Sequence, residues 1–151
     1  MEPKQIREIV DFAIQQFLDH DRYLLEADAN ELAMTGALSR YIAEQLPDWV
    51  VDCEYNRDRG TTKRLRLERG RHEFYRVPKS VRVIPDIIVH LRGTGDNLLV
   101  VESKKSSNEE PEDFDLHKLQ EYARQLDYRY ALFLKFIVGD APGIQSKWIR
   151  G

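Results

Sequence analysis

The segment VRVIPDIIVHLRGTGDNLLVVESKKS, residues 81–106, decides the fold of this chain. Its first half is apolar at alternate positions, and the run LLVV follows at residues 98–101. Alternation and short apolar runs of this kind are typical of β-strands. Between them, GTGDN at residues 93–97 carries two glycines and an Asp-Asn pair, which favour a tight turn. The segment therefore predicts an antiparallel β-hairpin.

Three ionisable residues of this hairpin are predicted to share one face. With the centre of the hairpin near Gly95, Asp86 lies opposite Lys104, and Ile88 lies opposite Glu102. Side chains alternate between faces, so these even-numbered residues point the same way, with direct neighbours about 5 Å apart and diagonal ones about 7–8 Å apart. Two such carboxylates repel each other unless a cation lies between them, and Mg²⁺ takes one or two carboxylates and several waters. Lys104 would then position or activate one of those waters.

The order Pro85-Asp86 followed by Glu102-x-Lys104 resembles the motif of the PD-(D/E)XK nuclease superfamily, the fold of restriction endonucleases. In that family the Asp and the Glu hold a Mg²⁺ or Mn²⁺ ion, often with the backbone carbonyl of the residue after the Glu, and the Lys assists the attacking water. The resemblance implies catalytic roles for Asp86, Glu102 and Lys104. It also implies that the Ser103 carbonyl joins Asp86 and Glu102 as a metal ligand.

The composition is that of one soluble globular domain, residues 1–151, because the chain is long enough for a real core and is 42% hydrophobic and 32% charged. A single cysteine, Cys53, excludes an internal disulfide and a cysteine-rich zinc site. No N-terminal apolar run resembles a signal peptide, and no stretch approaches the roughly 20 apolar residues of a membrane span. We therefore expect a cytoplasmic protein without a membrane partner.

Positive charge is concentrated in residues 57–82, a predicted basic insertion. The segment holds ten Lys or Arg and three acids, a net +7, so within a chain of net −3 the remainder carries −10. A basic segment that leads into the hairpin suits a phosphate backbone, and Lys63, Arg64 and Arg66 are the expected contacts with nucleic acid, DNA in preference. The alternative is a solvated loop whose charges pair with the acidic remainder.

Two helices are predicted before the first strand. Residues 1–27 form a packing helix whose apolar stripe covers either the sheet or a second subunit in a homodimer. The next helix is expected at residues 29–46, where Asp28 and Glu31 have the spacing of a capping box. Many members of the resembled superfamily bring an acidic residue from this helix into the metal site, and Glu31 is the candidate. Its alternative role is to close the capping box.

The remaining elements are expected to complete a restriction endonuclease-like αβββαβ core over residues 28–138, an α/β fold with a mixed central sheet flanked by helices. They are a strand at 49–57, an extra hairpin within 57–82, the hairpin of 81–106, a helix ending near 126, a strand at 130–138 and a tail at 139–151. A strand–helix–strand unit normally makes a parallel crossover, so the last strand should run parallel to the one that bears Glu102. Lys118 is expected to be an exposed helix lysine, with contact to phosphate as the alternative. His90 shares the face of Asp86 and is expected to be a strand-end residue that faces solvent, with a place at the edge of the site as the alternative.

These residues predict a metal-dependent nuclease that hydrolyses phosphodiester bonds in nucleic acid, DNA in preference, with Mg²⁺ or Mn²⁺ as cofactor. The alternative is a nuclease-like fold that serves as a nucleic-acid-binding or assembly module with little or no turnover. The presence of Asp86, Glu102 and Lys104 together favours the enzyme. The short chain and its net negative charge favour the module.

Overall fold

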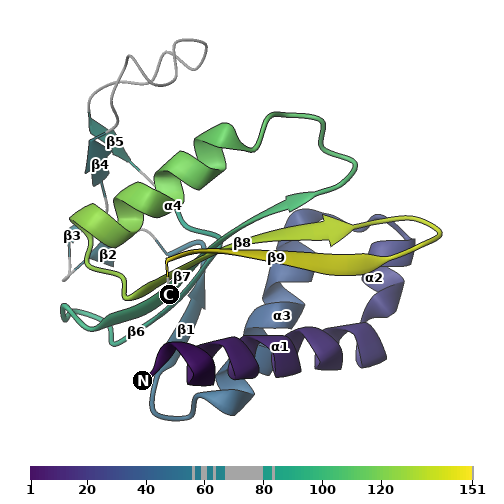
Figure 1. Cartoon of the computed structure of the whole chain (residues 1–151), viewed down its shortest axis with the longest axis horizontal. Helices are drawn as coiled ribbons and strands as arrows, with labels where there is room; N and C mark the ends of the chain where they lie inside the picture. The colour runs from purple at the N-terminus through teal and green to yellow at the C-terminus, as the bar shows by residue number, and fades with distance from the viewer. Residues whose placement is uncertain (56, 59–60, 63, 67–79, 83, 151) are drawn as a thin grey trace.

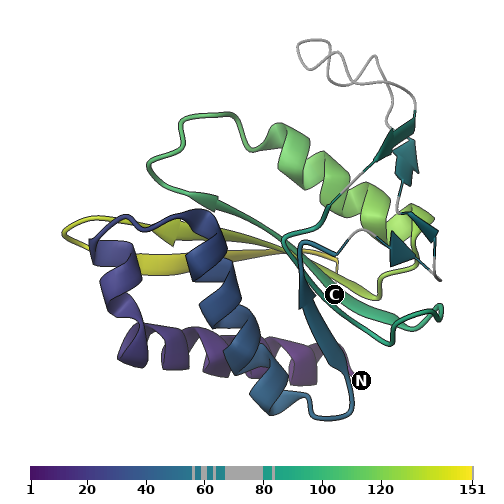
Figure 2. The same cartoon turned by 180° about the vertical axis from the view of Figure 1, so that it is seen from behind.

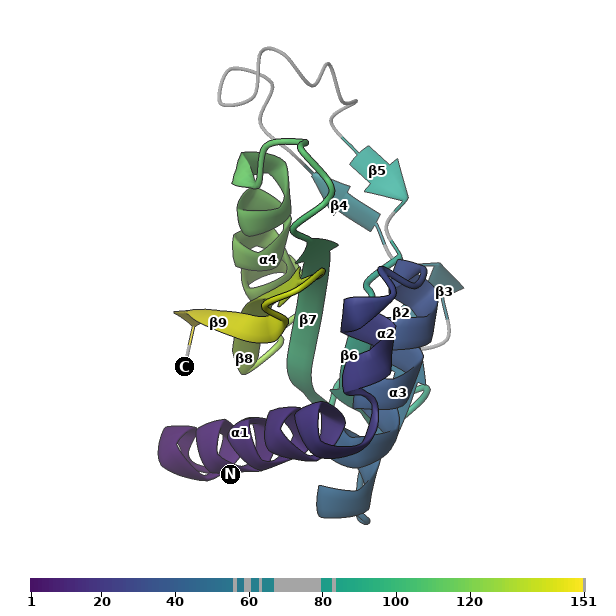
Figure 3. The same ribbon diagram turned by 90° about the vertical axis from the view of Figure 1, so that its right-hand side faces the viewer.

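The computed structural model describes residues 1–55, 57–58, 61–62, 64–66, 80–82 and 84–150. Within them, a mixed five-stranded sheet lies between two layers of helices (Figure 1). Helix α4 covers one face of the sheet, and helices α1 and α3 cover the other (Figure 3). The expected α/β class, with helices on both sides of a mixed sheet, is therefore confirmed.

The described helices are α1 (Pro3–His20), α2 (Arg22–Glu26), α3 (Glu31–Gln45) and α4 (Asp113–Gln125). The strands of the main sheet are, in spatial order, β1 (Val50–Cys53), β6 (Ile87–His90), β7 (Asn97–Lys105), β8 (Tyr130–Ile137) and β9 (Gly143–Arg150). Two small sheets pair β2 (Arg57–Asp58) with β3 (Thr61–Thr62), and β4 (Arg64–Arg66) with β5 (Ser80–Arg82). The basic insertion therefore does contain extra hairpin pairing. The view from behind shows α3 beside β1 (Figure 2).

The hairpin of β6 and β7 is confirmed, but its register differs from the predicted one by two residues. Ile88 lies opposite Val100 rather than Glu102, and the same pairing, continued by two residues, places Asp86 opposite Glu102. The chain reverses slightly earlier than expected, with Gly93 at a φ of 73°, a conformation that glycine adopts without steric cost. A shift of two residues leaves every side chain on its predicted face, because side chains alternate with a period of two.

Apolar side chains form a separate core on each face of the sheet. On one face, α1 and α3 pack against alternate residues of β6, β7 and β8. On the other face, the core comprises Ile88, Val100, Ala131 and Phe133 of the sheet with Leu119, Tyr122 and Ala123 of α4 and Leu126 and Tyr128 just after it. Strand β8 pairs in parallel with β7, as the predicted crossover requires.

Helix α1 covers the sheet of its own chain, which is one of the two roles predicted for its apolar stripe. Its fully buried residues are Ile6, Val10, Ala13 and Phe17. The homodimer remains a prediction. None of the described helices combines the length and the apolar character that crossing a membrane would require.

The predicted tail at residues 139–151 is wrong, because Gly143–Arg150 forms β9, an edge strand antiparallel to β8. Its apolar residues Ile144 and Trp148 pack on one core, and Ile149 packs on the other. An edge strand with one neighbour needs few apolar positions, so its pattern is weaker than that of a central strand. The short helix α2 was also missed.

Candidate functional site

The candidate site lies where β7 passes between the first turn of α3 and helix α4. Asp86 directly precedes β6, and its side chain is oriented by the neighbouring strand, since the Ser103 N–H donates to Asp86 Oδ2 over 2.8 Å. The Ser103 hydroxyl lies 3.2 Å from the same oxygen and 2.9 Å from Glu31 Oε1. One serine thus joins an acid of α3 to an acid of the hairpin.

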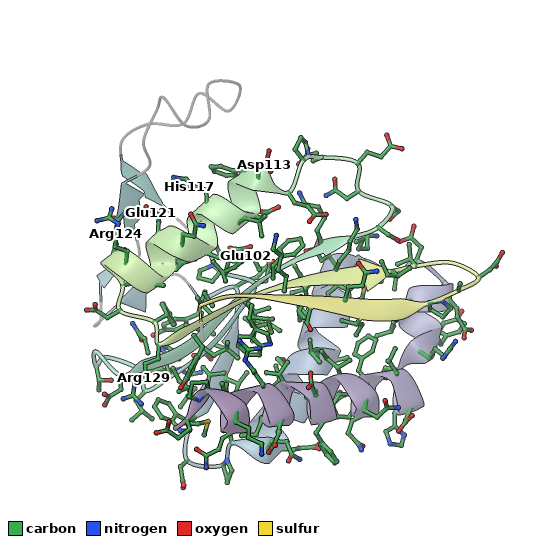
Figure 4. The ribbon with its side chains drawn as sticks, in the orientation of Figure 1. Glu102, Asp113, His117, Glu121, Arg124 and Arg129 are labelled. Carbon is green, nitrogen blue, oxygen red and sulfur yellow. The ribbon has the colours of Figure 1, made fainter. Side chains whose placement is uncertain are left out.

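Glu102 is buried between α4 and the sheet (Figure 4), with 4% of its side chain exposed. Its Oε1 accepts a hydrogen bond from the Tyr122 hydroxyl at 3.2 Å and lies 3.4 Å from Lys118 Nζ. Burial raises the pKa of Glu102 well above its usual range, and repulsion by the Asp86 carboxyl raises it further. The hairpin register and the hydrogen bond from Ser103 N–H place Asp86 beside Glu102, the residue that precedes Ser103.

Lys104 lies on the α4 side of the sheet but does not extend to Asp86 as a direct cross-strand neighbour. Its Nζ forms an ion pair with Asp115 Oδ2 at 2.7 Å. It also donates to the carbonyl oxygens of Glu110 and Pro111 over 3.4 and 3.3 Å. The corrected hairpin register explains this, because Lys104 lies two residues beyond the position that faces Asp86. The predicted pairing of Lys104 with Asp86 is therefore wrong.

Lys118 is a member of the site rather than the exposed lysine that the sequence predicted. Only 18% of its side chain is exposed, and its Nζ lies between Glu102 and Asp115, at 3.4 and 3.7 Å. Burial lowers the pKa of Lys118, but these two acids outweigh it and raise the pKa above its usual range. Acidic and basic side chains therefore alternate along a buried chain, in the order Glu102, Lys118, Asp115 and Lys104.

Glu31 lies beside the Ser103 hydroxyl that also contacts Asp86, and its alternative role in a capping box with Asp28 is wrong. The N-cap of α3 is Asn30, whose side chain accepts a hydrogen bond from Ala33 N–H over 2.8 Å. Asp28 lies outside the helix and forms an ion pair with Lys105 at 2.9 Å. Burial raises the pKa of Glu31, the Ser103 hydrogen bond lowers it, and Asp86 raises it, with a net increase.

Four contributions to the site were not predicted from the sequence. They come from the Ser103 hydroxyl, Asp115, Lys118 and Tyr122. The last three have helical spacings of three and four, which place them on one face of α4 with the buried Leu119. That periodicity was readable in the sequence. Their role in the site becomes clear only from the face of the sheet against which α4 packs.

Of the residues expected to bind nucleic acid, Arg64 and Arg66 belong to β4, which lies beside α4, and Lys63 lies outside the described residues. Their contact with nucleic acid remains a prediction.

His90 lies at the opposite end of β6 from Asp86 and belongs to a different cluster. It is buried, 3% exposed, and its Nε2 lies 2.7 Å from Asp52 Oδ2, so the prediction that it faces solvent is wrong. Arg92 donates two hydrogen bonds to the same carboxylate, and Tyr55 packs edge-on against the His90 ring. The cluster fixes β1 to the hairpin.

Asp52→Asn is expected to lower the free energy of unfolding by about 1–2 kcal/mol at pH 7. The reason is that it weakens the contacts of the Asp52 carboxylate with the buried His90 and with Arg92. Burial raises the pKa of Asp52, but Arg92 and His90 lower it to a net value below the ordinary one. A carboxyl with a lowered folded pKa stabilises the fold above its unfolded pKa of about 3.9, and this contribution is lost as pH falls through the folded value. Urea unfolding at pH 7 and below pH 4 should therefore show a difference that shrinks in acid.

Asp96→Asn, in the exposed turn of the same hairpin, serves as the control and should change stability little. An Asp52→Asn protein as stable as the parent at pH 7 would contradict the structural role.

Among the described residues, no three His, Cys, Asp or Glu side chains are grouped as a ready-made metal site. The carboxyls of Asp86 and Glu102 are two oxygen donors of the kind that hard divalent cations use. No protein-family model matches the chain, and comparison with curated proteins and with solved structures also found no match.

Proposed function

We propose that this chain is a PD-(D/E)XK-type nuclease that uses Mg²⁺ or Mn²⁺ to hydrolyse phosphodiester bonds in nucleic acid, DNA in preference. The observation that carries the proposal is the meeting of the Asp86 and Glu102 carboxyls at the open end of the β6–β7 hairpin. The element order supports it. Apart from the short strands β2 to β5, which lie between β1 and β6 in the chain, the elements follow the αβββαβ order of the resembled superfamily: α3, β1, β6, β7, α4 and β8.

The donor set fits a divalent cation. Asp86 and Glu102 would hold it together with the Ser103 carbonyl, and water would complete the coordination, as is usual for Mg²⁺. Burial and then repulsion by the Asp86 carboxyl raise the pKa of Glu102, and a cation between the two carboxyls would remove the repulsion. When bound, the ion would lower the pKa of a coordinated water and stabilise charge on the phosphate.

The chain itself supplies orientation and charge. Ser103 holds Asp86 through its N–H, and Tyr122 and Lys118 hold Glu102. In this proposal, Lys104 positions the water that attacks phosphorus, and Asp115 positions Lys104. The contacts of Lys104 with two backbone carbonyls are long, 3.3–3.4 Å, so they can be exchanged for water or phosphate. Hydrolysis then breaks one P–O bond and leaves a phosphate monoester and a hydroxyl.

The same contacts favour the second candidate function, a nuclease-like module that binds nucleic acid or a protein partner without turnover. The Lys104 ammonium already has three acceptors, in Asp115, Glu110 and Pro111. A lysine satisfied in this way is also what a purely structural role would produce.

An assay with single-stranded, double-stranded and branched DNA, and with RNA, tests the proposal. Cleavage should require Mg²⁺ or Mn²⁺ and should fall by at least about 10²-fold in Asp86→Asn, since a misplaced or missing ligand disrupts positioning of the reacting groups. Asp96→Asn, purified in parallel, should cleave like the parent and so control for a contaminating nuclease. A parent protein that binds the metal and cleaves none of these polynucleotides would favour the module instead.

A further inference from the structure

A shallow pocket of about 170 Å³ lies beside the candidate site, on the edge of the sheet formed by β8 and β9. Its lining residues are Glu112, Phe133, Lys135, Gln145, Ser146 and Lys147. None of them has a role in the site described above.

Strand register places this pocket next to the site residues on the α4 face. Lys104 of β7 is paired with Lys135 of β8, which is paired in turn with Gln145 of β9. One step back along the strands, Glu102 pairs with Phe133, and Phe133 with Lys147. Neighbouring strands lie about 4.8 Å apart, so the pocket begins one strand away from Glu102 and Lys104.

The charges of this region favour an anion. Like charges on directly paired residues are unfavourable, yet Lys104 and Lys135 are direct neighbours on one face. Each is offset by a different acid, Lys104 by Asp115 at 2.7 Å and Lys135 by Glu112 at 3.2 Å.

The Lys135–Glu112 pair is available for exchange with a ligand. Its side chains are 34% and 36% exposed, so solvent screens it and it contributes little to stability. Glu112 occupies the N-cap position of α4 but makes no capping hydrogen bond with its side chain. Lys147 is exposed on the pocket rim and adds a second cation.

We propose that this pocket binds a phosphate group of the nucleic-acid strand, adjacent to the phosphate that is cut. The inference rests on the proposed function and extends it by locating the path of the strand, across β8 and β9. Lys135 and Lys147 supply positive charge, and the Gln145 amide, on the same face of β9 as Lys147, supplies neutral donors. Phosphate displaces Glu112 from Lys135 on binding.

The test is the affinity for a short fluorescent single-stranded DNA, measured by anisotropy over a range of salt concentrations. Ca²⁺ replaces the catalytic ion, because it binds carboxylate oxygens with flexible geometry, and a gel confirms that the DNA stays intact. The double variant Lys135→Gln/Lys147→Gln should bind about tenfold more weakly, as expected for the loss of charged hydrogen bonds to one phosphate. Its slope of log K against log salt should be shallower by about 0.7, the value for one phosphate on a single strand.

A variant that is expected to bind DNA more tightly than the parent makes the test more specific. Among the described residues that line the pocket, Glu112 is the one carboxylate. Glu112→Gln removes it and releases Lys135, so this variant should bind DNA several-fold more tightly. Lys4→Gln is the matched control, because Lys4 is 88% exposed on α1 and pairs only loosely with Glu8, at 3.9 Å. It should match the parent.

The outcomes separate this inference from the proposed function. If the parent binds DNA but the double variant has the same affinity and salt slope, the pocket does not bind phosphate and the proposed function stands. Weaker binding by Glu112→Gln also overturns the inference. If the parent neither binds nor cleaves any polynucleotide, the proposed function fails, and the inference fails with it. Thermal unfolding of each variant confirms that these surface changes leave the fold intact.

Discussion

Replacement of Lys104 by methionine is expected to lower the single-turnover rate of DNA cleavage by about 10²–10⁴-fold, the usual contribution of a positioned acid–base group. Methionine keeps much of the apolar stem of the side chain and removes only the ammonium. Metal affinity and DNA affinity should stay within a few-fold of the parent, because Asp86, Glu102 and the pocket of β8 and β9 are unchanged. The measurement is single-turnover cleavage at saturating Mn²⁺.

Two controls keep this result interpretable. Lys105→Met alters the next residue of β7, which is also ion-paired, with Asp28 at 2.9 Å, but lies on the other face of the strand. It should cleave like the parent. The double variant Lys104→Met/Asp115→Asn removes both charges of the buried pair, so no charge is left uncompensated if Lys104→Met alone proves unstable. Cleavage at the parental rate by Lys104→Met would end the catalytic role of Lys104.

Glu102→Gln is expected to weaken metal binding but to stabilise the metal-free fold. It should weaken Mn²⁺ binding by at least about 100-fold, since loss of an outer-sphere partner alone typically costs 10–100-fold and Glu102 is a proposed ligand. It should also raise the free energy of unfolding at pH 8 in metal-free buffer by about 1 kcal/mol, or roughly 2–4 °C in melting temperature. The reason for the second effect is that a buried carboxylate beside Asp86 is replaced by a neutral amide of the same shape.

The pH dependence of that stabilisation has a definite sign. Burial and Asp86 raise the pKa of Glu102 in the folded protein. A carboxyl with a raised folded pKa contributes its full stability below its unfolded pKa, about 4.3, and loses it as pH rises through the folded value. The advantage of Glu102→Gln should therefore be small near pH 4 and grow towards pH 8.

Calorimetric Mn²⁺ titration and thermal unfolding at both pH values measure these effects, with Glu110→Gln as an exposed control near the same site. If Glu102→Gln is no more stable than the parent at pH 8, then Lys118 and Tyr122 compensate the buried charge fully. Unchanged Mn²⁺ affinity would remove the metal from this position.

Much of the fold could be predicted because its signals are local. The apolar alternation before Gly93 and the run at 98–101 indicated the central hairpin, and the apolar stretch of Tyr130–Ile137 indicated the parallel strand. The predictions that were wrong concerned segments whose structure depends on other parts of the chain. Strand β9 acquires its structure from pairing with β8, and Asn30 rather than Asp28 caps α3 because of where the chain turns before the helix.

By itself, the sequence determined that Asp86 and Glu102 lie close together. The apolar pattern decides which face each residue of a strand occupies, and this survives a register error of two residues because the period of a strand is two. Only the tertiary structure decided what the charged groups contact. The position of Asp115 and Lys118 over Glu102 depends on how α4 is rotated about its axis and how residues 106–112 lead into it. Neither is encoded in any local pattern, since both result from packing the whole helix against the sheet.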